Sequence, residues 1–138
     1  GRHGKMVSVK ETSNELQWSS DSNEQKRLIG ADNEYNGAYN MAKVKQIADW
    51  NYKYPAFAWC ADLGDGWYLP ARGELLAIYR NKDIVERAIS SRDGGYLRRY
   101  WSSTEYSELC ACYVYMSDGD TISRTKNTSS YVRAVSAF

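Results

Sequence analysis

The feature that most constrains the fold is a hairpin signal near the C-terminus. Asp118 and Gly119 stand between two short runs with strand character, residues 111–117 and 120–125. A tight turn needs a backbone with positive φ, which glycine adopts without strain, so this pair predicts an antiparallel hairpin. The second run has no apolar face, since Ile122 is its one apolar residue. A strand that buries neither face presents its side chains outward, so we expect functional residues here.

The segments around this hairpin also predict strands. Residues 100–105 (YWSSTE) are aromatic and hydroxyl-rich, and residues 131–138 alternate apolar and polar side chains. A period of two is typical of a half-buried strand. Residues 5–12 alternate in the same way and predict a first strand, and the polar residues 13–27 predict a loop.

Apolar residues at helical spacing predict three helices in the middle of the chain. The clearest covers residues 37–51 and carries one apolar stripe, Met41, Val44, Ile47 and Ala48. A second helix begins near Pro70, whose missing N–H is harmless in a first turn. A third, shorter helix covers residues 83–90. Residues 57–63 are either a buried turn of helix or an extended core segment.

Several short motifs resemble one family. They are YWSSTE at 100–105, Asp118-Gly119, Lys126, the VRAVSAF ending, GWYLP at 66–70 with Glu74-Leu75, Gly4-Lys5-Met6-Val7 with Val9, and Gln17-Trp18-Ser19. Together they resemble the C-type lectin-like fold. The resemblance is to the branch that is related to formylglycine-generating enzymes and includes the variable proteins of diversity-generating retroelements.

This resemblance implies an α+β fold in a single domain over residues 1–138. Two to three helices would pack on small antiparallel sheets, with the N- and C-terminal strands paired. We also expect this to be the C-terminal domain of a larger protein. The relatives work outside the cytoplasm, so an extracellular location at a cell or virion surface is implied.

Composition argues against two classes of partner. The 138 residues carry a net charge of +1, so there is no excess of basic residues for phosphate contacts, and we expect no nucleic acid. No apolar run approaches the length of a membrane span, and we expect no direct membrane insertion. The chain has twelve Tyr and five Trp against two Phe, and tyrosine is favoured on recognition surfaces.

Few residues are suited to catalysis or to metal binding. The chain has one histidine, His3, and three cysteines. Cys110 and Cys112 lie two apart, which is poor geometry for a mutual disulfide. Cys60 lies in an apolar run and predicts a buried thiol. One CxC pair and a lone histidine do not form a zinc pattern. We expect no metal at these residues and no cofactor, and a structural ion elsewhere is left open.

Two further observations argue against catalysis and against calcium. Asp118 and Asp120 flank a turn, where aspartate is common for local hydrogen bonding. Calcium-dependent lectins of this fold use an EPN or QPD loop and a WND triplet, and residues 101–103 (WSS) stand where WND is expected. We therefore expect a binding domain that is not an enzyme and does not read sugars through calcium at this site.

The leading hypothesis is a ligand-binding surface diversified by a retroelement. In such relatives, replacement of template adenines turns AAY codons into many residues, but never into Trp, Met, Lys, Gln or Glu. Within residues 100–138, ten residues are among those that such codons can encode after adenine replacement. They are the predicted variable, ligand-binding residues: Leu109, Cys110, Cys112, Tyr113, Tyr115, Asp120, Ile122, Arg124, Thr128 and Ser129. The residues that such codons cannot encode are Trp101, Glu105, Glu108, Met116 and Lys126. Except for Glu108, they stand at positions that are constant in the family. Either Glu108 is a fixed residue within the loop, or the assumed alignment with the family is shifted at that point.

Alternation within the hairpin assigns roles to these residues. Tyr113 and Tyr115 share a strand face and are expected to be rigid anchors for a protein or glycan ligand on another cell or surface. Cys112 shares the other face with Val114 and Met116, so it is either a surface residue or packs inward with them. The alternative function is an undiversified structural or adhesive module of a bacterial surface fibre or a phage tail.

Overall fold

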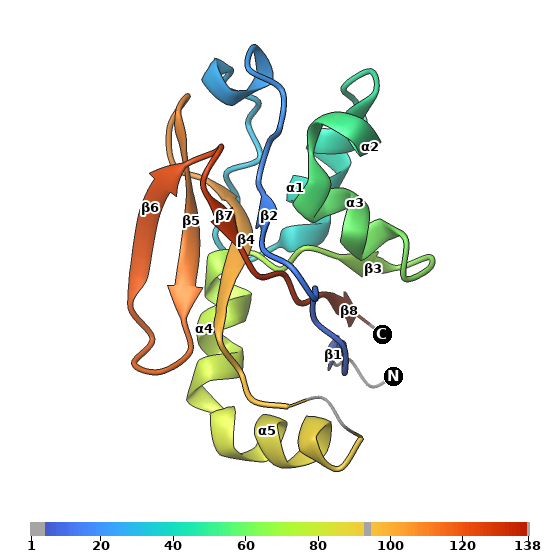
Figure 1. The fold of residues 1–138 in the computed structure, drawn as a ribbon, viewed down its shortest axis with the longest axis vertical. Helices are drawn as coiled ribbons and strands as arrows, with labels where there is room; N and C mark the ends of the chain where they lie inside the picture. Colours follow the sequence, from blue (N-terminus) through green and yellow to red (C-terminus); the bar gives the residue numbers. More distant parts are fainter. Residues whose placement is uncertain (1–4, 93–94, 138) are drawn as a thin grey trace.

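The structure, a computed structural model, describes residues 5–92 and 95–137. His3, Gly4, the Asp93-Gly94 end expected for the third helix, and Phe138 lie outside the described residues. The fold is α+β, with short helices and three small antiparallel sheets in the described part of the chain (Figure 1).

The strands form these sheets from segments far apart in the sequence. The first sheet has the order β1-β8-β3, from Lys5–Val7, Val135–Ala137 and Trp67–Tyr68. The second pairs β2 (Leu16–Gln17) with β7 (Ser129–Ser130). The third has the order β4-β5-β6, from Arg99–Glu105, Cys110–Tyr115 and Thr121–Thr125.

The helices follow one another between β2 and β4. A 3-10 turn η1 (Glu24–Lys26) precedes α1 (Gly37–Lys45), α2 (Trp50–Lys53), α3 (Pro55–Ala61), α4 (Arg72–Arg80) and α5 (Lys82–Ser90). The predicted helices at Pro70 and at 83–90 therefore correspond to α4 and α5. The open alternative for residues 57–63 is resolved as helix, since α3 covers most of that run.

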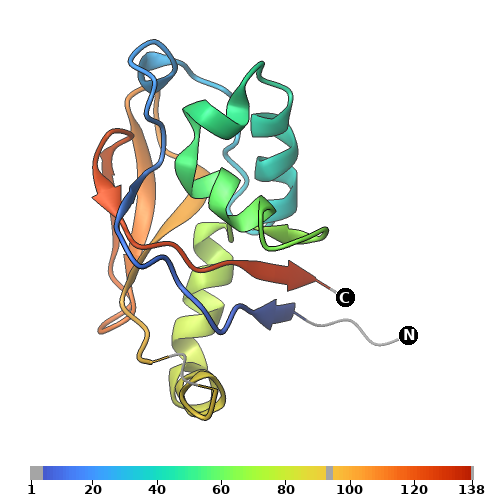
Figure 2. The same cartoon turned by 45° about the vertical axis from the view of Figure 1, so that its right-hand side comes forward.

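The predicted pairing of the first and last strands is confirmed. Lys5 lies opposite Ala137 and Val7 opposite Val135 in an antiparallel register. Figure 2 shows β1 and β8 side by side, crossing the molecule next to α4.

Two expectations about these segments need correction. The helix expected over 37–51 ends at Lys45, and α2 begins after Asp49, whose φ of 59° is left-handed and interrupts the helix. The end of the chain is not half-buried, because residues 132–136 are all buried. Arg133 is 2% exposed, and its guanidinium donates to the carbonyl oxygens of Ser8 and Val9. The alternating pattern would place the Arg133 side chain in solvent, and these hydrogen bonds allow it to be buried instead.

The core lies on both sides of the β4-β5-β6 sheet. On one side Tyr100, Val114 and Met116 pack with Leu75 of α4 and Ile89 of α5. On the other side Trp101, Ala111 and Tyr113 join a larger cluster around Trp18, Phe57 and Leu69. Helices therefore pack on both faces of the sheet, and the hairpin β5–β6 forms one margin of the molecule (Figure 1).

The GWYLP motif with Glu74 has a structural role. The buried Glu74 carboxylate accepts hydrogen bonds from the Gly37 and Ala71 backbone N–H groups, at 2.6 and 3.0 Å, and from the Tyr68 hydroxyl at 2.6 Å. A Cβ on Gly37 would lie 2.5 Å from the Leu69 carbonyl oxygen, so this close approach requires glycine. One carboxylate therefore joins the starts of α1 and α4 to β3.

Candidate ligand-binding face

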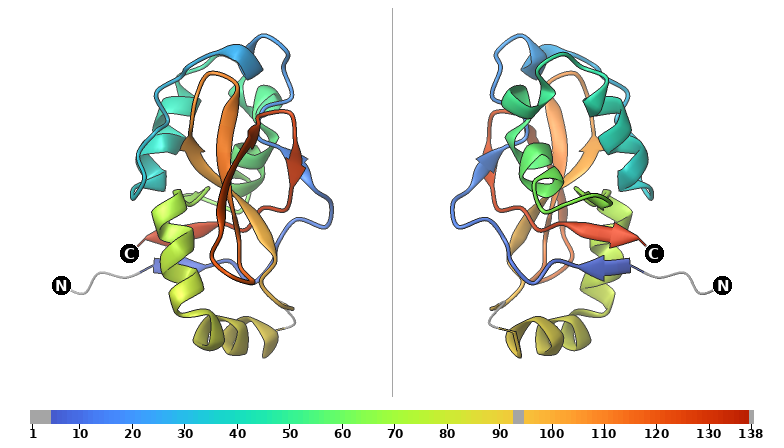
Figure 3. Two further views of the ribbon diagram at one scale, coloured as in Figure 1. Left: turned by 90° about the vertical axis from the view of Figure 1, so that its left-hand side faces the viewer. Right: turned by 90° about the vertical axis from the view of Figure 1, so that its right-hand side faces the viewer.

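The register of the third sheet brings a group of side chains onto one face. Tyr113 lies opposite Trp101 on β4 and opposite Ile122 on β6. Directly opposed residues of antiparallel strands share a face, and so do residues two apart on one strand. We call the resulting group the tyrosine face: Arg99, Tyr113, Tyr115, Ile122 and Arg124. Figure 3 (left) looks onto the side of the molecule where the β5–β6 hairpin lies in front.

Aromatic and cationic contacts connect the tyrosine face. The rings of Tyr113 and Tyr115 meet edge to face with 5.5 Å between centroids. The Arg99 guanidinium lies 5.0 Å from the Tyr113 centroid, and that of Arg124 lies 5.8 Å from it. Cations at this distance are attracted by the ring quadrupole. Tyr113 is thereby covered and is 3% exposed, while Tyr115 is half-buried.

The two tyrosine hydroxyls titrate differently because their surroundings differ. Burial raises the pKa of Tyr113, and its hydrogen bond with Tyr115 adds to this. The hydrogen bond with Tyr113, and then one with the Arg99 guanidinium, lowers the pKa of Tyr115. Tyr115 is therefore the more acidic and more accessible hydroxyl of the pair, and the better placed to contact a ligand.

The turn of the hairpin is held against α4. Gly119 has a φ of 77°, and a Cβ at this position would lie 2.7 Å from the ring of Tyr79. Glycine is needed for both reasons. The Asp118 carboxylate accepts a hydrogen bond from the Asp120 backbone N–H at 2.9 Å, so this carboxylate serves the turn itself.

The base of the hairpin is fixed by a buried ion pair. Lys126 Nζ lies 2.7 Å from Glu105 Oε2, and both side chains are 0% exposed. The same ammonium donates to the Arg27 carbonyl oxygen at 2.8 Å and lies 5.1 Å from the Trp18 ring. The Glu105 carboxylate accepts from the backbone N–H groups of Ile29 and Gly30. Burial lowers the pKa of Lys126, and the Glu105 carboxylate opposes that effect.

The ten predicted residues do not form one surface. Tyr113, Tyr115, Ile122 and Arg124 lie together on the tyrosine face, and Ser129 joins them because its carbonyl oxygen accepts from Arg99 at 3.3 Å. Asp120 is exposed beside the hairpin turn. Four others lie apart from this group: Leu109, Cys110, Cys112 and Thr128.

These four are placed for different reasons. Leu109 is 53% exposed in the β4–β5 connection, near Gln25 and Lys26. The Thr128 hydroxyl pairs with that of Thr125 at 2.8 Å. Cys110 is half-buried at the start of β5, on the sheet face opposite to the tyrosine face.

The structure decides whether Cys112 is a surface residue or packs inward. It is 2% exposed and shares its strand face with Val114, so it packs inward. Burial raises the pKa of its thiol. The CxC pair is therefore not an exposed pair. The exposure expected of Tyr113 is also wrong, since Trp101, Tyr115 and two guanidinium groups surround its ring.

Arg99 is the residue that sequence reasoning missed. It lies opposite Tyr115 on β4, and its guanidinium is 5.9 Å from the Tyr115 centroid. Glu15 forms an ion pair with it from the segment before β2. The sequence does contain a signal that assigns Arg99 to this face. Arg99 is two residues before Trp101, and alternation along a strand puts both side chains on one face.

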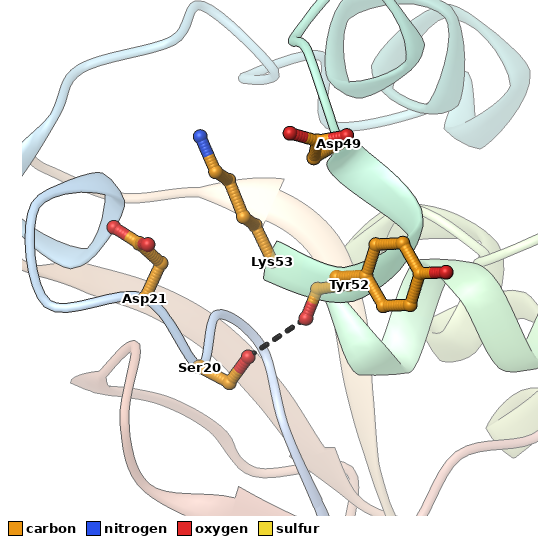
Figure 4. Close-up of a pocket in the computed structure, with 5 residues that line it drawn as sticks. All are labelled: Ser20, Asp21, Asp49, Tyr52 and Lys53. Carbon is orange, nitrogen blue, oxygen red and sulfur yellow. Dashed lines mark hydrogen bonds between the residues drawn. The ribbon is translucent and has the colours of Figure 1, made fainter.

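A separate concavity lies beside α2 (Figure 4). Its volume is about 400 Å³, and it is lined by Ser20, Asp21, Asp49, Tyr52 and Lys53. The Ser20 hydroxyl donates to the Tyr52 carbonyl oxygen at 2.9 Å, and the Lys53 ammonium is 3.8 Å from a Glu24 carboxylate oxygen. The concavity shares no residue with the tyrosine face.

Among residues 5–92 and 95–137, no group of three or more His, Cys, Asp or Glu side chains is arranged to hold a metal ion. Within the same ranges, every helix is too short or too polar to cross a bilayer.

The paired terminal strands, the helices on both faces of the β4-β5-β6 sheet and the hairpin at its margin define a C-type lectin-like domain, a class of ligand-binding and adhesion modules. The sequence profile of the family described as the Lcl C-terminal domain matches residues 7–136. The chain therefore belongs to the Lcl C-terminal domain family. No curated protein matches this sequence.

Proposed function

We propose that this domain binds a protein or glycan on another surface through the tyrosine face, and that the exposed residues around this face are diversified by a retroelement. The observation that carries the proposal is the cluster of two tyrosines and two arginines at the margin of the β4-β5-β6 sheet, where Tyr115 is half-buried and Arg124 is exposed. Tyrosine and arginine are enriched among residues that dominate binding energies. An extracellular, surface-exposed location follows from the same proposal.

Binding rather than catalysis fits the surroundings of two carboxylates near this face, Asp118 and Glu105. Asp118 is engaged by the turn, and the buried Glu105 is engaged by Lys126 and two backbone N–H groups. A general acid or base has to reach a substrate proton, and neither group is free to do so.

A binding experiment tests the role of the face. The purified domain would be applied to an array of immobilised glycans and to a panel of intact bacterial cells. The double variant Tyr115→Ala with Arg124→Ala should lose at least about tenfold in affinity for whichever probe the native domain binds. Tyr52→Ala is the matched control, since Tyr52 is 76% exposed and lies outside the tyrosine face. Retained binding in the double variant would contradict the assignment of the face.

Tyr113 is a core residue as well as a member of the tyrosine face, so its substitution should affect stability as well as binding. Replacing a buried aromatic side chain by alanine costs about 3–5 kcal/mol. Tyr113→Ala should therefore lower the unfolding midpoint in urea strongly, whereas Tyr115→Ala should lower it by a small amount. Equal effects would show that the two rings are buried alike.

Population sequencing tests diversification. The codons of Tyr115, Asp120, Ile122 and Arg124 should vary among sister copies at adenine positions of a nearby template repeat, next to a reverse-transcriptase gene. The codons of Trp101, Met116 and Lys126 should be constant. Variation spread evenly over both sets would refute diversification without affecting the binding proposal.

One observation favours the alternative of an undiversified adhesive module. Cys112 and Tyr113 are 2% and 3% exposed, so a random residue at either position would leave a void or a clash in the core. In that case the locus would lack a template repeat, and the tyrosine face would have the same residues in all copies.

A further inference from the structure

The outer edge of β6 is an unpaired strand edge. The sheet order is β4-β5-β6, and among the described residues β6 pairs with β5 alone. Figure 1 shows β6 at the margin of the molecule, and none of the described helices or strands lies beyond it. An uncovered edge offers a row of backbone donors and acceptors to another strand.

The register identifies which backbone groups point outward. The Tyr115 N–H donates to the Asp120 carbonyl, and the Lys126 N–H donates to the Leu109 carbonyl. Hydrogen-bonded pairs alternate along an antiparallel ladder, so Ile122 and Arg124 also bond toward β5. The N–H and C=O groups of Thr121, Ser123 and Thr125 therefore point away from the sheet.

Natural edge strands are protected against pairing, and β6 has little of this protection. Residues 121–125 contain no proline and no lysine, and the β5–β6 register has no bulge. The one local cap is the Arg124 guanidinium, which donates to the Ser123 carbonyl oxygen at 3.1 Å. Arg124 is an exposed side chain, so this contact is easily exchanged for a better one.

The side chains of β6 are complementary to a second copy of the same strand. In an antiparallel pair centred on Ile122, that residue faces its own copy, Thr121 faces Ser123, and Asp120 faces Arg124. The Thr121–Ser123 pairs join residues whose backbone groups point outward, as a hydrogen-bonded pair requires. Two Asp120–Arg124 pairs of opposite charge then flank a central pair of isoleucines, and each such cross-strand pair is stabilising.

We propose that this domain self-associates through β6, as a symmetric dimer in which the two β4-β5-β6 sheets join into one six-stranded sheet. The two-fold axis stands perpendicular to the sheet, because the Ile122 side chains of both copies share a face. Both tyrosine faces therefore lie on the same side of the joined sheet and present two adjacent binding surfaces. The contact is small, so the dimer is weak and forms at high local concentration.

Self-association requires no ligand and can be measured without one, although it uses Ile122 and Arg124 of the tyrosine face. Its test is sedimentation velocity of the 138-residue chain over a range of concentrations. The native domain should show a concentration-dependent shift from monomer to dimer.

Charge exchange tests the register. Arg124→Asp places two aspartates opposite each other at both symmetric pairs and should weaken self-association by about tenfold or more. Asp120→Arg should do the same with arginines. The double variant Asp120→Arg with Arg124→Asp restores both pairs in exchanged order, so it should recover the native dissociation constant within about threefold.

A backbone variant tests the edge itself. Ser123→Pro removes an outward N–H without touching a hydrogen bond to β5, and it should abolish dimerisation while the circular dichroism spectrum stays native. A native domain that stays monomeric at all concentrations would overturn the proposal and leave this edge to a strand of another protein. Self-association that survives Ser123→Pro, or that the double charge exchange fails to restore, would overturn it as well.

Discussion

Lys126 places a positive charge in the interior, between the hairpin and the segment that precedes α1. Its ammonium contacts Glu105, the Arg27 carbonyl and the Trp18 ring, and no part of the side chain is exposed. An alanine or methionine at this position would leave the Glu105 carboxylate without its counter-charge. Lys126 is thus a structural residue within a stretch whose neighbours face solvent.

Removal of this ammonium should be strongly destabilising. Lys126→Met is expected to lower the free energy of unfolding by about 3–5 kcal/mol, because it leaves an uncompensated buried carboxylate. Urea denaturation followed by tryptophan fluorescence measures the change. The control Lys26→Met removes an exposed ammonium and should stay within about 0.5 kcal/mol of the native value. A loss below about 1 kcal/mol for Lys126→Met would contradict the burial of this pair.

At the scale of elements, the break between α1 and α2 is set by the backbone of Asp49. Its φ of 59° is the one positive value among the described residues other than glycine. Aspartate tolerates this region better than most residues, and β-branched residues tolerate it poorly. The apolar stripe that predicted a helix through Asn51 contains no sign of this break, because Asp49 is also a normal residue on the solvent side of a helix.

Substitution at Asp49 should therefore depend on backbone preference. Asp49→Val should lower the free energy of unfolding by about 1–3 kcal/mol, and Asp49→Gly should leave it equal or slightly higher. Asp62→Val is the matched control, since Asp62 is exposed and has right-handed backbone angles at the end of α3. Thermal unfolding of the three variants measures the difference. Equal effects of valine at both positions would mean that Asp49 is not left-handed in solution.

The sequence was informative wherever one local rule decided the structure. The Asp118-Gly119 turn follows from turn chemistry, and the pairing of the terminal strands follows from the family resemblance. The second helix is expected near Pro70, but α4 begins at Arg72, so Pro70 lies before the helix and not in its first turn. Alternation also placed Tyr113 and Tyr115 on one face. It did not predict that Tyr113 is buried or that Arg133 bonds to the segment around Ser8, because such burial depends on contacts between distant parts of the chain.

At the scale of the whole molecule, three buried tyrosines share one arrangement. The hydroxyls of Tyr54, Tyr68 and Tyr100 donate to Glu24, Glu74 and Glu11 at 2.8, 2.6 and 2.7 Å. Burial is the largest cause that raises the pKa of each phenol, and the carboxylate adds to it. For Tyr100 the pKa rises to about 12 from an ordinary value of 10.0.

These tyrosines should make the domain sensitive to alkali. A phenol with a raised folded pKa contributes stability that is complete below the unfolded pKa near 10 and is lost as the pH rises through the folded value. Tyr100 alone should reduce the free energy of unfolding by about 2–3 kcal/mol between about pH 10 and 12. Urea midpoints measured across this range give the slope.

The control for this titration is a comparison of two tyrosine-to-phenylalanine variants. Tyr100→Phe should make the decline with pH shallower, because one coupled proton is removed. Tyr52→Phe should leave the decline unchanged, since Tyr52 is exposed. A stability profile that is flat above pH 10 would show that the buried phenols ionise as readily as in the unfolded chain.

The adjacency of β1 and β8 has a practical consequence for handling the protein. Because Lys5 and Ala137 face each other across one ladder, both ends of the described chain leave the molecule at the same place, away from the β5–β6 hairpin (Figure 1). A biosensor chip that captures the domain through a tag at either end should orient every copy with its hairpin toward the flowing analyte. The same geometry would let the domain be grafted into a surface loop of an unrelated carrier with two short spacers.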